Sequence, residues 1–171
     1  RESENKNRLA KERLESEAER RKSAETTALR GTIGVAWKYL QNANLKGAME
    51  QTSIAIHYAP SYVEPYRLAT LINLAQFNFK EALDYSNELP ADKYPDLREI
   101  CLDLAHNKSP QSSYIEIVKL FKVNSAEKIY SYVISKILKR LNSEDKNRFL
   151  KDLILLHNNA LDEFSIFLSP D

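Results

Sequence analysis

The stretch NLKGAMEQTSIAIHYAP, residues 44–60, returns in altered form 34 residues further along the chain. NLKGA at residues 44–48 aligns with NFKEA at residues 78–82, and four of the five positions are identical or similar. With the same shift, Leu40 falls on Leu74, and Pro60 falls on Tyr94, one position before Pro95. The spacing therefore indicates an internal repeat and not a single amphipathic helix.

The repeated alanines Ala48 and Ala82 indicate where two helices cross closely, because a larger side chain there would push the helices apart. Three glycines and six prolines in 171 residues favour an all-α chain over a turn-rich β architecture. Helices are expected at residues 28–42, 45–58, 62–75 and 79–89.

Two capping boxes are predicted to begin helices of the repeat, one formed by Ser61 with Glu64 and the other by Asn78 with Glu81. In such a box each residue satisfies a backbone N–H that the first helical turn leaves free.

A 34-residue period with small residues in the second helix and proline at its end resembles the tetratricopeptide repeat. The resemblance implies an all-α fold, a right-handed superhelix of antiparallel helix pairs. Asn73 departs from the aromatic residue usual at its position, and Thr52 and Ser86 stand where a larger residue is common. The units span residues 29–62 and 63–96, with a degenerate third from residue 95.

Residues 1–28 are expected to form a charged connector helix outside the repeats. The first 30 residues hold 16 charged side chains, and Leu9 and Leu14 are the only large apolar residues before Leu29, so they form no heptad seam. This stretch resembles the connector that follows the kinase and membrane segments of some bacterial receptor-like serine/threonine kinases. That resemblance implies a part of a larger protein.

Residues 109–171 are expected to form helices that complete or cap the solenoid. The tail from Leu161 to Leu168 is too apolar for a solvated end, so we expect it to be buried against this chain or another one.

The charge balance excludes some partners. With 25 basic and 24 acidic residues the net charge is +1, which disfavours nucleic acid. The chain contains no run of about 18 apolar residues, so no membrane insertion is expected. A cytoplasmic and a periplasmic location both remain open. The single cysteine, Cys101, lies in an apolar-periodic stretch and is expected to be a buried, inert thiol.

No motif predicts catalysis. GTIG at residues 31–34 lacks the GK[ST] of a phosphate loop and is predicted to interrupt a helix. His57, His106 and His157 lie about fifty residues apart, with no HExxH pattern. We therefore expect no enzyme, no metal site and no cofactor.

The tetratricopeptide resemblance implies a concave, partner-binding face lined by the first helices of the units. Relatives that hold a C-terminal carboxylate have lysine and asparagine where Ile33 and Trp37 stand here, so that clamp is absent. Either the apolar lining takes up a partner segment, or it is core covered by later helices of the same chain. The implied residues are Arg30, Ile33, Trp37, Leu40, Glu64, Arg67, Leu71 and Leu74.

Two function classes follow. The first is a non-catalytic interaction module that holds a protein or peptide segment. The second is a structural or homo-oligomerisation domain that uses the charged N-terminal helix and the apolar C-terminal tail.

Overall fold

The computed structural model describes residues 1–122 and 127–168, with side chains as far as residue 158. Within these ranges every regular element is a helix, which confirms the all-α prediction. The elements are α1 (Glu2–Gln41), α2 (Leu45–Tyr58), α3 (Glu64–Ala75), α4 (Phe79–Ser86), α5 (Pro95–His106), the 3₁₀ turn η1 (Pro110–Ser113), α6 (Tyr114–Phe121), α7 (Lys128–Arg140) and α8 (Ser143–Leu168).

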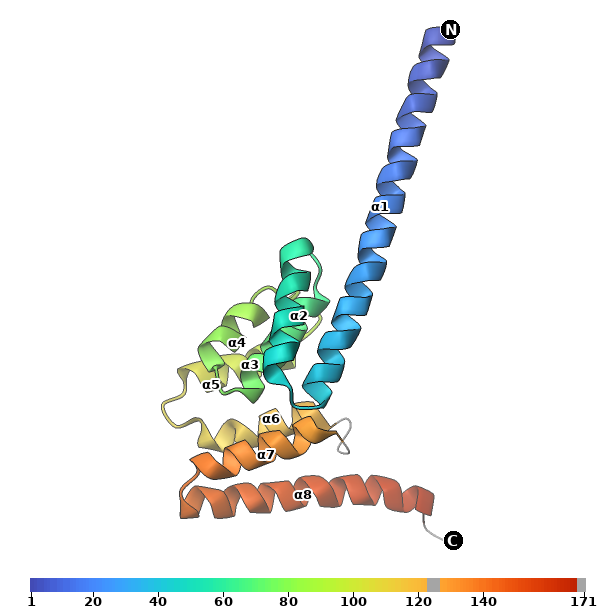
Figure 1. Cartoon of the computed structure of the whole chain (residues 1–171). Helices are drawn as coiled ribbons and strands as arrows, with labels where there is room; N and C mark the ends of the chain where they lie inside the picture. Colours follow the sequence, from blue (N-terminus) through green and yellow to red (C-terminus); the bar gives the residue numbers. More distant parts are fainter. Residues whose placement is uncertain (123–126, 169–171) are drawn as a thin grey trace.

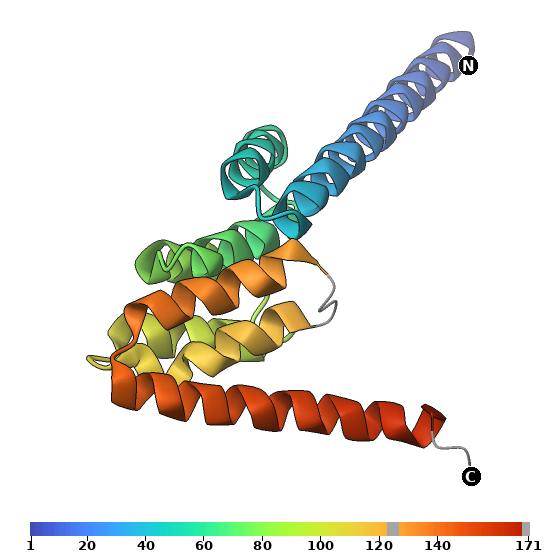
Figure 2. The same ribbon diagram turned by 60° about the horizontal axis from the view of Figure 1, so that its bottom comes forward.

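The first five helices pack in chain order, each against the next (Figure 1). α6 pairs with α7, and α7 returns to contact α1. α8 packs on α6 and η1, so that α6 and α7 separate it from the first helices (Figure 2). One hydrophobic core runs from Ile33 in α1 to Phe149 in α8.

The expected helix at residues 45–58 coincides with α2, and α5 begins at Pro95, the residue at which a third unit was expected to begin. The capping box of Ser61 and Glu64 is wrong, because the residue that caps α3 is Val63. Asn78 does precede α4, but its side chain accepts no hydrogen bond from the helix, and its Nδ2 instead donates to Gln76 Oε1 at 3.3 Å.

The predicted interruption at GTIG is also wrong, because α1 runs unbroken from Glu2 to Gln41. Each glycine inside a helix costs about 1 kcal/mol relative to alanine. Burial of Ile33, Ala36 and Leu40, with α1 packed on α2, offsets that cost. No break in the helix therefore marks the expected boundary at residue 28, although residues 1–25 are exposed and project as a rod (Figure 1).

The turn after α1 and the turn after α3 have the same backbone geometry. Ala43 has φ 62° and Phe77 has φ 60°, both left-handed, and the two residues lie 34 positions apart. In the first turn, Asn44 N–H donates to Tyr39 C=O at 2.8 Å and Ala43 N–H donates to Leu40 C=O at 2.9 Å. The same pair of bonds recurs in the second turn, from Asn78 N–H to Asn73 C=O at 2.9 Å and from Phe77 N–H to Leu74 C=O at 3.1 Å. This pair is the Schellman helix ending.

The residues at the helix crossings are buried and small. Ala48 and Ala82 are fully buried, as are Thr52 and Ser86. The Thr52 hydroxyl donates to Ala48 C=O at 2.7 Å, and the Ser86 hydroxyl donates to Leu83 C=O at 2.7 Å. Each hydroxyl is hydrogen-bonded within its own helix. Having Thr52 and Ser86 in place of the larger residue common at these positions therefore leaves no buried hydroxyl unsatisfied.

The apolar tail from Leu161 to Leu168 continues α8. In both views its last turns lie away from α1 and α3 (Figures 1 and 2). The tail therefore lies apart from the first helices, and its expected burial falls on side chains, those of residues 159–168, that lie outside those described.

Candidate functional site

The eight residues implied as a binding face separate into two groups. Leu40 and Leu74 are 1% and 0% exposed, and Ile33 and Leu71 are also buried. Trp37, Glu64 and Arg67 are partly exposed, and Arg30 is exposed. Leu40 and Leu74 are therefore core residues, which is one of the two alternatives that the sequence left open. Only the partly or fully exposed residues and the edge of Leu71 can meet a partner.

One of the later helices, α7, shares the core of the first helices. α7 contacts α1 and contributes Ile129, Val133 and Ile137 to the same core. At the other end of α7, Lys136 Nζ and Arg140 Cζ lie 5.5 and 4.4 Å from the ring centroid of Phe77, in the turn between α3 and α4. α7 thus covers part of the face that an open helical array would expose.

Arg67 on α3 gathers the residues that remain accessible. Its Cζ lies 5.0 Å from the ring centroid of Trp37 on α1 and 5.6 Å from that of Tyr94, which immediately precedes α5. Its terminal Nη2 lies 3.6 Å from Glu64 Oε1, one turn earlier on α3. We call Trp37, Glu64, Arg67, Leu71 and Tyr94 the Arg67 patch.

Electrostatics and sterics hold this guanidinium in place. Two aromatic rings attract its positive charge, and Glu64 restrains its end. The Nε atom of Arg67 is buried and has no hydrogen-bond partner in the protein. A guanidinium has five N–H donors, and because Nε is buried, only the terminal nitrogens of this partly exposed side chain can meet a ligand.

A pocket of about 270 Å³ opens beside Arg67. It lies where α3, the start of α5 and the end of α6 meet. Most of its lining is apolar, and Lys93 and Asp96 add one positive and one negative side chain besides Arg67. The lining residues are Arg67, Leu71, Lys93, Tyr94, Pro95, Asp96, Leu97 and Leu120.

Sequence reasoning found Arg67 and Leu71 but missed Tyr94, Lys93 and Leu120. The 34-residue shift was projected onto two units only. α4 is much shorter than α2, so α5 begins earlier than the 34-residue repeat predicts. The segment before α5 therefore lies beside α3. The sequence did point to Tyr94, because the 34-residue shift places it on Pro60, near the end of the first unit. Nothing in the sequence pointed to Leu120, because only the tertiary fold brings it to the pocket.

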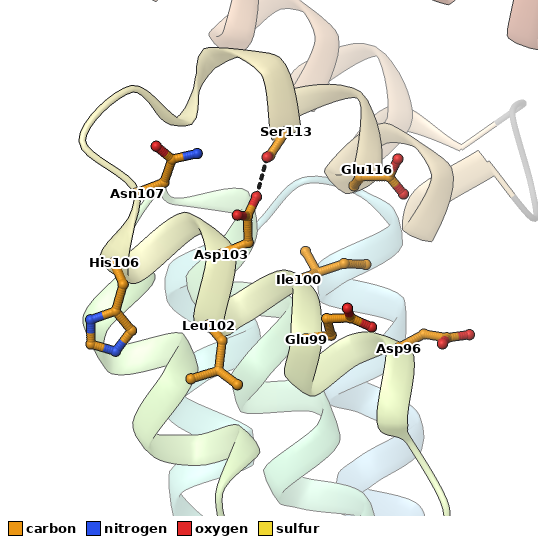
Figure 3. A pocket seen from close by; sticks show the side chains of 9 residues that line it. All are labelled: Asp96, Glu99, Ile100, Leu102, Asp103, His106, Asn107, Ser113 and Glu116. Carbon is orange, nitrogen blue, oxygen red and sulfur yellow. Dashed lines mark hydrogen bonds between the residues drawn. The ribbon is translucent and has the colours of Figure 1, made fainter.

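A second, larger hollow of about 790 Å³ borders the outer face of α5 (Figure 3). The Ser113 hydroxyl donates to Asp103 Oδ2 across it, and Lys119 Nζ lies 3.0 Å from Glu116 Oε1. Asp96 lines both hollows, so they adjoin. Four carboxylates make this second hollow acidic, those of Asp96, Glu99, Asp103 and Glu116.

Asp103, His106 and Ser113 share this acidic hollow but do not form a catalytic triad. A triad needs the serine hydroxyl bonded to the histidine. Here the hydroxyl donates to Asp103 instead, and the His106 ring points away from that bond (Figure 3).

The other reactive groups also have structural surroundings. Burial raises the pKa of the Cys101 thiol to about 11, although a hydrogen bond with Ser86 opposes the shift. A thiol with such a pKa stays protonated and unreactive near neutral pH. His157 shares a 2.7 Å hydrogen bond with the Tyr130 hydroxyl, and burial raises the pKa of Tyr130. Across the described residues, His, Cys, Asp and Glu nowhere gather in threes that could hold a metal ion.

In the described part of the chain, the helices all fall short of the length and apolarity that crossing a membrane requires. Protein-family models, curated proteins and solved structures were each compared with the chain, and none matches it.

Proposed function

We propose that the chain is a non-catalytic protein–protein interaction module made of tetratricopeptide-like helix pairs. In this proposal the end of α1 pairs with α2, α3 pairs with α4, and α5 begins a degenerate third unit. The pairs are antiparallel and form a short right-handed superhelix that α6, α7 and α8 cap. Its support is the recurrence, at 34 residues, of a left-handed residue, of two turn hydrogen bonds and of a buried small residue at each crossing.

The module belongs to a larger protein in this proposal. The exposed, highly charged first part of α1 supports this, since it connects to the repeat without a break and adds little to the core. Its resemblance to the connector of bacterial receptor-like serine/threonine kinases makes a scaffold role beside a kinase a specific form of the proposal.

The partner is an extended protein or peptide segment that lies on the Arg67 patch. Arginine, tryptophan and tyrosine are the residue types that contribute most to binding energy at interfaces. Because Arg67 is already held by Trp37 and Tyr94, ordering it on binding costs little further entropy. A backbone carbonyl or carboxylate of the segment accepts hydrogen bonds from Arg67, and an apolar side chain enters the neighbouring pocket.

The observation that carries the proposal is the convergence of Trp37, Arg67 and Tyr94, from three separate elements, beside a pocket of about 270 Å³. Cores commonly contain single aromatic residues. A partly exposed arginine between two rings, with an apolar pocket beside it, is instead an arrangement typical of binding surfaces.

A random peptide library displayed on phage tests the proposal. Peptides selected on the wild-type chain should lose at least about tenfold in affinity, some 1.4 kcal/mol, for Arg67→Ala and for Trp37→Ala. Tyr39→Ala is the matched control, because Tyr39 is an exposed aromatic residue on α1 outside the patch. Circular dichroism of each variant checks that helix content is retained.

Trp37 also serves as a probe, since it is the only tryptophan of the chain. Bound peptide should protect its fluorescence from acrylamide in the wild type. Peptides that bind the Arg67 and Trp37 variants as tightly as the wild type would reject the Arg67 patch as the binding surface.

Homo-oligomerisation is the second candidate function. It is favoured by an exposed apolar groove on α1 and α2 that is separate from the Arg67 patch. Light scattering over a range of concentrations distinguishes the two candidates, because a chain that stays monomeric rejects homo-oligomerisation.

A further inference from the structure

An apolar groove of about 320 Å³ lies between α1 and α2. On the α2 side, Ile54 is exposed and Tyr58 is 76% exposed. Large apolar side chains exposed beside a hollow mark a contact surface. The groove is lined by Glu25, Ala28, Leu29, Thr32, Ile54 and Tyr58.

The stripe of α1 that lines this groove continues along the exposed rod. Its positions follow at alternating intervals of four and three residues, so they share one face of the helix. Leu14 is 68% exposed and is the only large apolar residue of this stripe before the groove. The stripe comprises Leu14, Ala18, Arg21, Glu25, Ala28 and Thr32.

This stripe is complementary to itself when two copies run antiparallel. A two-fold axis midway between Arg21 and Glu25 sets Arg21 of each copy opposite Glu25 of the other, which makes two opposite-charge pairs. The same axis sets Ala18 opposite the second copy's Ala28, where small side chains allow the helices to approach. It also brings Leu14 opposite the second copy's Thr32, at the groove.

We propose that two copies of this chain associate through α1 as an antiparallel, two-fold dimer in which Leu14 of each copy fills the α1–α2 groove of the other. The rod of one copy then packs on the edge of the other as an additional helix. A parallel, in-register pair would instead oppose Arg21 with Arg21 and keep Leu14 away from the groove. The inference rests on the second candidate function and on none of the residues of the Arg67 patch.

Disulfide cross-linking tests the register. Ala18→Cys with Ala28→Cys places two thiols ten residues apart on one helix, about 15 Å, too far for a bond within a chain. A disulfide between them must therefore join two copies. The matched control is Ala18→Cys with Thr27→Cys, because Thr27 adjoins Ala28 but points to a different side of α1. Cys101 is buried and is present in both variants.

Mild oxidation should convert the first variant to a covalent dimer that a reducing agent dissociates, while the control stays monomeric on a denaturing gel. Equal cross-linking of both variants, or of neither, would overturn the proposed arrangement.

Charge reversal tests the pairing independently. Arg21→Glu and Glu25→Arg should each weaken dimerisation at least about tenfold in sedimentation equilibrium, because each opposes like charges twice. The double variant restores opposite charges and should return to within about threefold of the wild type. Leu14→Ala should also weaken the dimer, while circular dichroism stays unchanged because all three side chains are exposed.

A wild-type chain that stays monomeric at the highest soluble concentration would overturn both this proposal and the second candidate function. A dimer that none of these variants affects would overturn the proposed surface and leave homo-oligomerisation standing. Neither result bears on peptide binding at the Arg67 patch, which the library selection tests separately.

Discussion

The turns at Ala43 and Phe77 share one backbone conformation but differ in what their side chains do. Ala43 is partly exposed at the end of α1. Phe77 is 8% exposed, and its ring centroid lies 5.4 Å from that of Phe79 and 5.3 Å from that of Tyr114 on α6. The first turn therefore only reverses the chain, whereas the second also anchors the C-terminal helices.

This difference shows how a repeated unit acquires a tertiary role. A left-handed conformation costs a residue with a Cβ about 1–2 kcal/mol. Burying a phenylalanine side chain contributes about 1.5–3 kcal/mol, so contacts with α6 and α7 offset the strain at Phe77. Ala43 is only partly buried against the core, so less burial offsets the same strain there.

Of the substitutions that test this difference between the two turns, Phe77→Ala should reduce stability the most. Loss of the ring should reduce the free energy of unfolding by about 3–4 kcal/mol, because α6 and α7 lose their contact with the turn. Urea unfolding followed by circular dichroism measures it. Phe77→Leu, which keeps most of the apolar volume, should cost less than half as much. If the free energy of unfolding of Phe77→Ala lies within about 1 kcal/mol of the wild-type value, Phe77 does not anchor the C-terminal helices.

Ala48→Leu and Ala82→Leu should each cost about 1–3 kcal/mol through overpacking at the two helix crossings. Both alanines are fully buried, so both units should respond. Ala91→Leu is the exposed control and should be nearly neutral. Unfolding midpoints equal to the control would show that these alanines do not mark close crossings.

Asn44→Ala should cost about 1 kcal/mol, because the Asn44 side chain accepts a hydrogen bond from Gly47 N–H at 3.0 Å and caps α2. Asn78→Ala should cost less than about 0.5 kcal/mol, since Asn78 makes no such bond to α4. The urea unfolding midpoints of the two variants check this difference. Equal losses of unfolding free energy would show that both asparagines cap their helices in solution.

The neighbourhood of the cap explains the difference between the two asparagines. A Cβ added at Gly47 would lie 2.8 Å from Asn44 Nδ2. The second unit has Glu81 at the corresponding position, where the Cβ is present. The cap position of the side chain is thus more crowded in the second unit.

Ala43→Gly should have a small effect of the opposite sign. Glycine adopts the left-handed conformation without the Cβ penalty but loses more entropy on folding, so a net gain of about 0.5–1 kcal/mol is expected. Thermal unfolding should show a modest rise in the midpoint. A fall would mean that the Ala43 side chain packs usefully in the turn, as that of Phe77 does.

The local features of this protein follow from its sequence. The 34-residue shift located α2 and the buried small residues Ala48 and Ala82, because contacts between residues close in sequence specify them. The exposed character of the rod followed from its charge, since it has too little apolar surface to bury. GTIG misled because the low helix propensity of its two glycines was outweighed by burial of neighbouring residues.

Which faces of the helices are covered depends on the tertiary fold. The return of α7 to α1 places it in the same core as Leu40 and Leu74, and the short α4 brings Tyr94 to Arg67. These outcomes depend on helices far apart in sequence, and a repeat pattern describes each unit only against its neighbours. An apolar position looks the same in sequence whether a partner or a later helix of the same chain covers it, because both bury the same surface by the same hydrophobic effect.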